Sequence, residues 1–319
     1  MTADVKYVDS VGLPGSAGDL TVARMGFKAY NLARMAHLGL PVPQAFVLGT
    51  PLCAEHHGAP QAFAERLGGL LKAQMARLHA ACGLEFAAER KPLLVSVRSG
   101  APVSMPGMMD TLLNIGLTDA TLRGLLRLTG NPRMVWDSYR RLIQQFAEVV
   151  HAASPAPFRA ALETAMQRAR VARAQELDFR SLAALTKEYL SLFESVTGKP
   201  FPQNPFDQLE AAIGAVFDSW RSARAVEYRR MHDIPEDMGT AVTVQRMVFG
   251  NAGGRSGSGV GFTRDPASGE NRLYLDFRFN SQGEDVVAGR HGANDAPRLG
   301  VALPAVAAQL QSLRRVLES

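Results

Sequence analysis

Two cations in the first third of the sequence have the character of phosphate ligands. Lys28 comes just before a predicted helix, where its ammonium group can reach a bound phosphate. Arg98 follows the largely apolar run LLVSV, so we expect it at a strand end, where ligands commonly bind. Its planar guanidinium group matches the geometry of phosphate oxygens. Taken alone, Lys28 fits a solvated surface lysine better than a phosphate ligand, whereas Arg98 fits a partner of a carboxylate equally well.

A turn rich in glycine and methionine follows Arg98. In the stretch SMPGMMD, Gly107 leaves the backbone free to approach a ligand. Met105, Met108 and Met109 offer a soft apolar lining beside it. The alternative that the methionines belong to the core stays open.

A second glycine-rich segment, GNAGGRSGSGVG, covers residues 250–261 and is predicted to be a loop between strands. The backbone N–H groups of such loops can cradle phosphates. The segment lacks the Gly-Lys-Ser/Thr of a P-loop and the following helix of a dinucleotide fingerprint. A plain hairpin loop fits its composition equally well. The candidate ligand-binding residues are Gly253, Gly254, Ser256, Gly257 and Gly259.

Carboxylates near the C-terminus could bind ribose hydroxyls or a metal ion. Asp276, Glu284 and Asp285 are the candidates, although the pattern in isolation favours plain surface carboxylates at strand ends. The seven histidines form no HxxxH or HxH pair and the two cysteines form no CxxC pair, so no metal site is expected from them. The metal ligands therefore remain unassigned.

The composition predicts a globular protein of more than one packed unit. The chain has 319 residues, of which 46% are hydrophobic and 20% charged, with a net charge of +5. This charge permits anionic ligands. The sequence has no block of Lys and Arg residues interleaved with aromatic residues, so we expect no nucleic-acid surface. No stretch has membrane-spanning length and no apolar signal core opens the sequence, so we expect a cytoplasmic protein.

The first third of the chain predicts the elements that must position Lys28 and Arg98. A helix over residues 29–38 is ended by Gly39 and Pro41, and a strand follows at 46–48. Apolar residues at helical spacing predict a long helix over 59–82.

The middle of the chain is almost wholly helical from about 118 to 230. Asn131-Pro132 and Asn204-Pro205 are typical helix starts, with the asparagine as N-cap. Two more helices are expected near 156–175 and 179–196. The helix after Asn131 carries three arginines that could contact phosphate, of which the adjacent pair should offer at most one: Arg133, Arg140 and Arg141.

From residue 239 the pattern changes to strands, VTVQRMV, VGFTR and RLYLDFRF, followed by a last helix from Pro304. We therefore expect an α+β fold in three parts. They are a first lobe (1–117 with 200–238), a helical subdomain (118–199) and a smaller second lobe (239–319) that carries the glycine-rich loop.

Together these stretches resemble the N-terminal nucleotide-binding domain of the pyruvate, phosphate dikinase family. The run RSGAPVSMPGMMD is the most specific part of the likeness. The matching segments span residues 26 to 289: GFKAYNLARMAHLGLPVPQAF, LLVSVRSGAPVSMPGMMDTLLNIGL, GNPRMVWDSYRRLIQQF, MHDIPEDMGTAVTVQRMVFGN and SGSGVGFTRDPASGE with NSQGEDVVAG.

The resemblance implies a two-lobed, ATP-grasp-like fold that binds ATP and Mg²⁺. It implies that Lys28 and Arg98 contact the ATP phosphates with help from Arg141 and that the 250–261 loop closes over the triphosphate. It also places Glu284 at the ribose end. One departure is Phe27, which stands where the family has glycine.

The resemblance further implies transfer of a phosphoryl group from ATP to a histidine on a separate domain or chain, which then phosphorylates pyruvate at another domain. In the family, the helix that begins near Pro304 leads on to Asp-x-Glu and Gln-x-Arg pairs that bind magnesium and the reacting phosphates. This chain ends at Ser319, before those pairs. The alternative is therefore a non-catalytic nucleotide-binding module or an inactive fragment.

Overall fold

The computed structural model describes residues 7–13, 20–283, 286 and 295–318. The chain divides into two compact units, Met1–Met247 and Val248–Ser319. Helices and antiparallel strands make up both units, so the predicted α+β class is confirmed.

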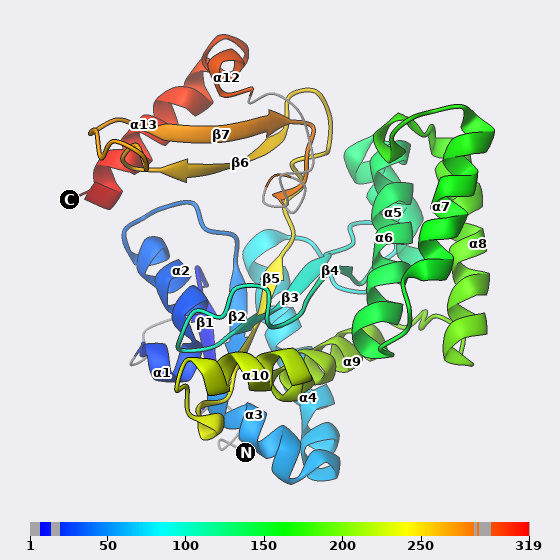
Figure 1. Cartoon of the computed structure of the whole chain (residues 1–319), viewed down its shortest axis with the longest axis horizontal. Helices are drawn as coiled ribbons and strands as arrows, with labels where there is room; N and C mark the ends of the chain where they lie inside the picture. The colour runs from blue at the N-terminus through cyan, green and yellow to red at the C-terminus, as the bar shows by residue number, and fades with distance from the viewer. Residues whose placement is uncertain (1–6, 14–19, 284–285, 287–294, 319) are drawn as a thin grey trace. The chain divides into compact units, whose positions relative to one another are not determined.

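A five-stranded antiparallel sheet organises the first unit (Figure 1). Its spatial order is β1-β2-β5-β3-β4, so β5, which comes last in sequence among these five strands, lies at the centre of the sheet. β5 comes from the stretch that sequence patterns assigned to the second lobe. The strands are β1 (Val8–Val11), β2 (Ala45–Leu48), β3 (Val95–Gly100), β4 (Thr111–Ile115) and β5 (Ala241–Arg246).

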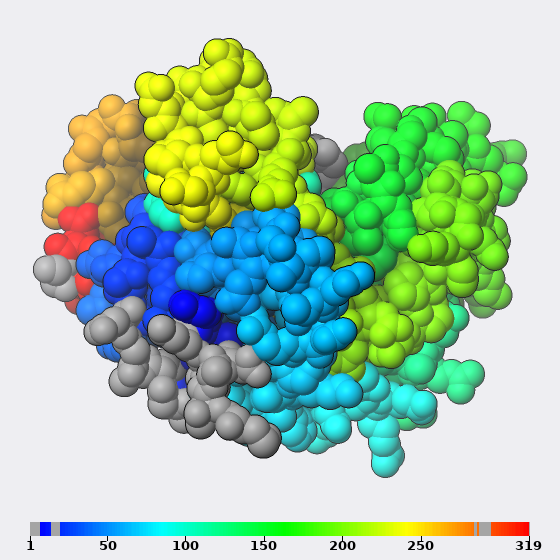
Figure 2. Space-filling view, turned by 90° about the horizontal axis from the view of Figure 1, so that it is seen from below, coloured from blue at the N-terminus to red at the C-terminus, as the bar shows by residue number. Residues whose placement is uncertain are grey.

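Both faces of this sheet are covered by helices. α3 (Thr50–Gly58) contacts β5, and α9 (Pro205–Asp218) contacts β3, β4 and β5, while α4 (Pro60–Cys82) packs on α3 and α9. α1 (Val22–Met25) and α2 (Phe27–His37) build a separate apolar cluster with β1, β2 and β5. Figure 2 shows α3 and α4 (light blue) next to the α10 segment (yellow) on the surface.

The side chains of β2 are buried on both faces of the sheet. Successive side chains of a strand point to opposite faces, so Ala45 and Val47 join the α1–α2 cluster while Phe46 and Leu48 point the other way. Phe46 and Leu48 are fully buried, and each such side chain stabilises the fold by about 1.5–3 kcal/mol.

The helices of the middle region begin where the sequence predicts. Asn131 caps α6 by accepting a hydrogen bond from the Met134 N–H, and Asn204 caps α9 through the Phe206 N–H. The helices predicted near 156–175 and 179–196 correspond to α7 and α8, although α7 ends earlier than predicted, at Ala169. The bounds are α5 (Asp119–Thr129), α6 (Pro132–Val150), α7 (Ala156–Ala169), η1 (Ala174–Glu176), α8 (Phe179–Thr197), η2 (Ser219–Arg221), α10 (Ala223–Met231) and η3 (Glu236–Met238).

The second unit contains an antiparallel hairpin of β6 (Gly257–Phe262) and β7 (Tyr274–Phe279), with α12 (Ala296–Ala302) against β7 and α13 (Pro304–Glu318) against α12. In the described parts of both units, no helix is long and apolar enough to span a membrane.

Candidate functional site

The junction of α1 and α2 packs directly on the end of β3. Gly26 has a φ of 76°, and a Cβ placed on it would lie 1.8 Å from the carbonyl oxygen of Gly100. The Phe27 N–H donates to the Ala101 carbonyl at 2.9 Å, and the Gly100 N–H donates to the Thr240 hydroxyl at 3.2 Å. These contacts fix the start of α2, and therefore Lys28, beside β3.

Lys28 and Arg98 are both exposed at this junction. Neither side chain forms a hydrogen bond or ion pair with a residue that the structure describes. Although Lys28 is exposed, the surrounding protein displaces part of its hydration. This desolvation, followed by the positive charge of Arg98, lowers the pKa of Lys28. Two neighbouring cations that have no carboxylate partner among the described residues favour an anionic ligand.

Arg98 lies inside β3 and not after it, because the strand continues to Gly100. Its neighbours across the sheet are Thr111 on β4 and Thr243 on β5. It is the exposed residue in an otherwise buried strand, so its side chain is held at a rigid position.

The methionine turn is anchored to α10 by the Arg224 side chain. Met105 is buried, as the core interpretation predicts, while Met108 and Met109 are half-buried. Gly107 is exposed with a φ of 71° and has open space around its Cα, so the backbone there is accessible. Arg224 donates to the Met108 carbonyl at 3.1 Å and pairs with Asp110. No local pattern in the sequence marks Arg224 as this anchor.

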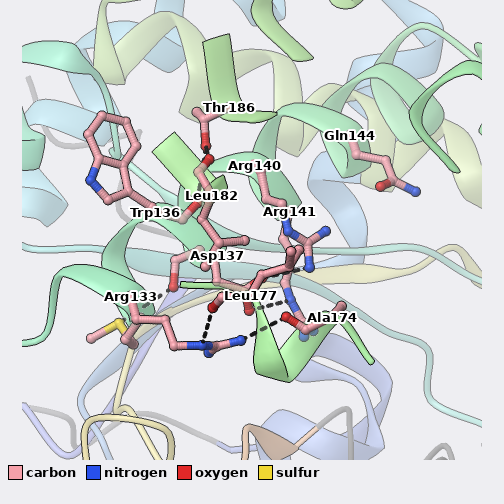
Figure 3. A network of polar contacts seen from close by, with 12 residues as sticks. Arg133, Trp136, Asp137, Arg140, Arg141, Gln144, Ala174, Leu177, Leu182 and Thr186 are labelled. Carbon is pink, nitrogen blue, oxygen red and sulfur yellow. Dashed lines mark hydrogen bonds and ion pairs between the residues drawn. The ribbon is translucent and has the colours of Figure 1, made fainter. Parts of the chain in front are cut away.

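Two adjacent arginines of α6 pair with one buried carboxylate (Figure 3). Arg140 lies 2.6 Å and Arg141 3.0 Å from oxygens of Asp137, and Arg133 donates to two backbone carbonyls at η1 and just beyond it. Burial alone would raise the pKa of Asp137, but Arg140, Arg141 and Arg133 together hold it below its ordinary value. The Arg141 side chain is 36% exposed and that of Arg140 5%, so Arg141 is the member of the pair with access to solvent.

The predicted glycine-rich loop is shorter than expected, because strand β6 begins at Gly257. Gly253 and Ser256 close a tight turn through hydrogen bonds of 2.7–3.0 Å. A Cβ on Gly257 would lie 2.2 Å from the Phe277 ring, and one on Gly259 2.7 Å from the Asp276 carbonyl. Glycine is therefore required in β6 by close cross-strand packing. Around Gly253 and Gly254 there is open space.

Two predicted carboxylates, Glu284 and Asp285, lie outside the described residues. Asp276 lies on β7 opposite Val260. Its Oδ1 atom is buried and has no hydrogen-bond partner among the described residues, and the Nε atom of Arg278 is in the same situation.

One group of potential metal ligands was not predicted. Among the described residues, three side chains lie close enough together to hold a metal ion: His56 and His57 on α3 and Asp218 on α9. This group does not include Lys28 or Arg98. Among the described residues, no such group of potential metal ligands forms around those two cations.

Comparisons with known proteins agree on one family. The family model described as pyruvate phosphate dikinase, AMP/ATP-binding domain, matches residues 61–312. The chain is 42% identical over 295 residues to pyruvate, phosphate dikinase of Clostridium symbiosum and 46% identical over 270 residues to that of Giardia intestinalis. These alignments cover 92% and 83% of this chain, but 34% and 30% of the relatives. The chain thus spans about a third of the length of the curated relatives it matches.

Proposed function

The chain belongs to the pyruvate phosphate dikinase AMP/ATP-binding domain family, and on that premise we propose that it binds ATP with the phosphates against Lys28 and Arg98. The proposal is carried by the positions of two exposed cations without described partners. Lys28 lies at the start of α2, and Arg98 lies on the strand against which this helix start packs.

The position of Lys28 in α2 adds a second attraction for phosphate. It is the second residue of an 11-residue helix, whose N-terminus carries a partial positive charge. The ammonium group, the guanidinium group and this helix end therefore act in the same sense. Arg98 can donate two parallel hydrogen bonds to phosphate oxygens, which also orients the nucleotide.

We propose further that the bound ATP donates a phosphoryl group to a histidine on a separate domain or chain. Negative charge on the transferring group is stabilised by fixed cations in such reactions, which is the role we give to Lys28 and Arg98. Arg141, Gly253, Gly254, Ser256 and Glu284 stay predicted nucleotide contacts. Pyruvate as the final acceptor and the cytoplasmic location are also predictions.

Mg²⁺ would supply further neutralisation of the phosphate charge. Lys28 and Arg98 fit the phosphates and not the ion, since a cation prefers oxygen ligands such as carboxylates. We therefore propose that Mg²⁺ arrives with ATP, and we assign it no ligand among the described residues.

Calorimetric titration with MgATP tests the binding proposal. We expect wild-type protein to bind and Arg98→Ala to bind at least about tenfold more weakly, since a hydrogen bond to a charged group contributes about 1.5–3 kcal/mol. Arg168→Ala is the matched control, because Arg168 is an exposed arginine on α7. Equal affinity of Arg98→Ala and wild type would contradict the phosphate role of Arg98.

The transfer step needs a separate test. The phosphohistidine domain of a relative is supplied with the chain and MgATP, and phosphohistidine formation is measured. Transfer supports the phosphotransferase proposal, whereas ATP binding without transfer favours the non-catalytic nucleotide-binding module.

A further inference from the structure

The geometry points to a transition-metal site of the zinc class, formed by His56, His57 and Asp218 on the helical face of the first unit. This site shares no residue with the proposed ATP site. The three residues come together only in the fold, because Asp218 is 162 positions from His56 and 161 from His57 in sequence.

The ligand atoms already converge. The Nε2 atoms of His56 and His57 lie 2.9 and 3.2 Å from the same oxygen, Oδ1 of Asp218. The potential ligand atoms of the three side chains all lie within 4.8 Å of one another. Zinc bonds to nitrogen and oxygen are about 2.0–2.2 Å long, so small rotations of the side chains bring all three atoms onto one ion.

The His56 ring is held in place by packing against two phenylalanine rings. The His56 ring lies 5.4 Å from the Phe63 ring and 5.5 Å from the Phe217 ring, measured between centroids. Phe217 directly precedes Asp218, so the same end of α9 packs the first ligand and presents the third. A site whose ligands are positioned beforehand loses less entropy on binding an ion.

The second ring nitrogen of His57 has a contact of its own. Its Nδ1 atom lies 3.8 Å from the sulfur of the buried Cys53, one helical turn earlier on α3. When Nε2 binds a metal, Nδ1 keeps its proton and can donate a weak hydrogen bond to the sulfur, which helps to orient the ring. Cys53 therefore acts on the other side of the ring from the ion.

Exposure and ligand type define which ion fits. The side chains of His56 and His57 are 17% and 9% exposed and that of Asp218 is 64% exposed, so water can complete the coordination from the Asp218 side. Two imidazole nitrogens and one carboxylate favour Zn²⁺ and its transition-metal neighbours over Mg²⁺, which prefers oxygen ligands.

Titration of the metal-free 319-residue chain with Zn²⁺ tests the site. We expect one Zn²⁺ per chain that Mg²⁺ does not displace, with affinity reduced by more than about 100-fold in His57→Gln and Asp218→Asn, since even outer contacts change metal affinity by about 10–100-fold. His232→Gln and Asp207→Asn are matched controls, because both residues are exposed and lie outside the cluster. Zn²⁺ affinity unchanged in the ligand variants, or no binding to wild type, would overturn the proposal.

Two further readouts separate lost ligation from lost folding. Zn²⁺ should raise the melting temperature of wild type and controls but not that of folded Asp218→Asn, the variant at the more exposed position. In imidazole ¹⁵N spectra of wild type, Zn²⁺ should shift the Nε2 signals of His56 and His57 alone among the histidines. Shifts at other histidines with none at this pair would also overturn the assignment.

Discussion

Gly26 and Gly100 meet so closely that no side chain fits between them. A Cβ on Gly26 would lie 1.8 Å from the Gly100 carbonyl oxygen, and Gly26 itself has φ 76° and ψ 157°, a backbone region that is nearly exclusive to glycine. This contact joins the helix that carries Lys28 to the strand that carries Arg98. The distance between the two cations therefore depends on a backbone contact that involves neither charged side chain.

Replacing Gly26 with alanine should damage both stability and nucleotide binding. Gly239→Ala is the matched control, because Gly239 has a similar backbone (φ 68°, ψ −176°) but its Cβ would meet nothing closer than 3.4 Å. Backbone strain alone costs about 1–3 kcal/mol, so we expect Gly26→Ala to lose more than Gly239→Ala in urea unfolding. Equal losses would show that the clash with Gly100 is relieved cheaply.

ATP affinity should fall as pH rises through the lowered pKa of Lys28. The ammonium form attracts phosphate, and desolvation together with Arg98 makes it deprotonate at a lower pH than an ordinary lysine. Bound phosphate favours the charged form again, so binding should take up protons on the alkaline side. Calorimetry across pH, in buffers of different ionisation enthalpy, measures this uptake. Lys28→Arg should remove the pH dependence, and an identical profile in that variant would assign it elsewhere.

Asp137→Asn should destabilise the protein by about 3–5 kcal/mol, the usual loss when one partner of a buried ion pair is removed. The exposed pair Glu227–Arg230 provides the control, and Glu227→Gln should leave stability nearly unchanged, because solvent screens exposed ion pairs.

The same carboxylate predicts an acid-sensitive contribution to stability. Because the folded pKa of Asp137 is depressed, its contribution is fully present above the ordinary carboxyl pKa and is lost as pH falls through the lowered value. Urea unfolding of wild type and Asp137→Asn at several acidic pH values should therefore give curves that converge as pH falls. Parallel curves would contradict the assignment.

The glycines near β6 should separate into two classes. Gly257→Ala must displace the Phe277 ring, whereas Gly254→Ala enters open space. We expect the first to lower the thermal stability of the second unit and the second to leave it unchanged. Any loss of MgATP affinity in Gly254→Ala would then report a ligand contact and not a folding defect. Equal thermal stability of the two variants would contradict the packing role of Gly257.

Local signals in the sequence were sufficient for the helices. Asn131 and Asn204 cap α6 and α9 as predicted, because an N-cap is recognised from the residue and its immediate neighbours. The long helix predicted over 59–82 is α4, and the strand predicted at 46–48 lies within β2.

Contacts between segments that are distant in sequence could not be predicted from local patterns. The assignment of the 241–246 strand to a second lobe followed the order of the chain, whereas the strand pairs with β2 and β3 in the first unit. The start of β6 was missed because glycine is rare in strands, and only the position of Phe277 explains it. His56 and His57 gave no recognisable spacing, since their third partner, Asp218, is supplied by another helix.

The central position of β5 has a consequence for how the chain matures during synthesis. β1 and β2 emerge from the ribosome early, as do β3 and β4, yet the strand that joins these pairs ends at Arg246. Until then the inner edges of β2 and β3 present unpaired backbone groups, which are prone to association with other chains. The sheet therefore closes in one late step of high contact order, and the nascent chain is at its most vulnerable just before that step.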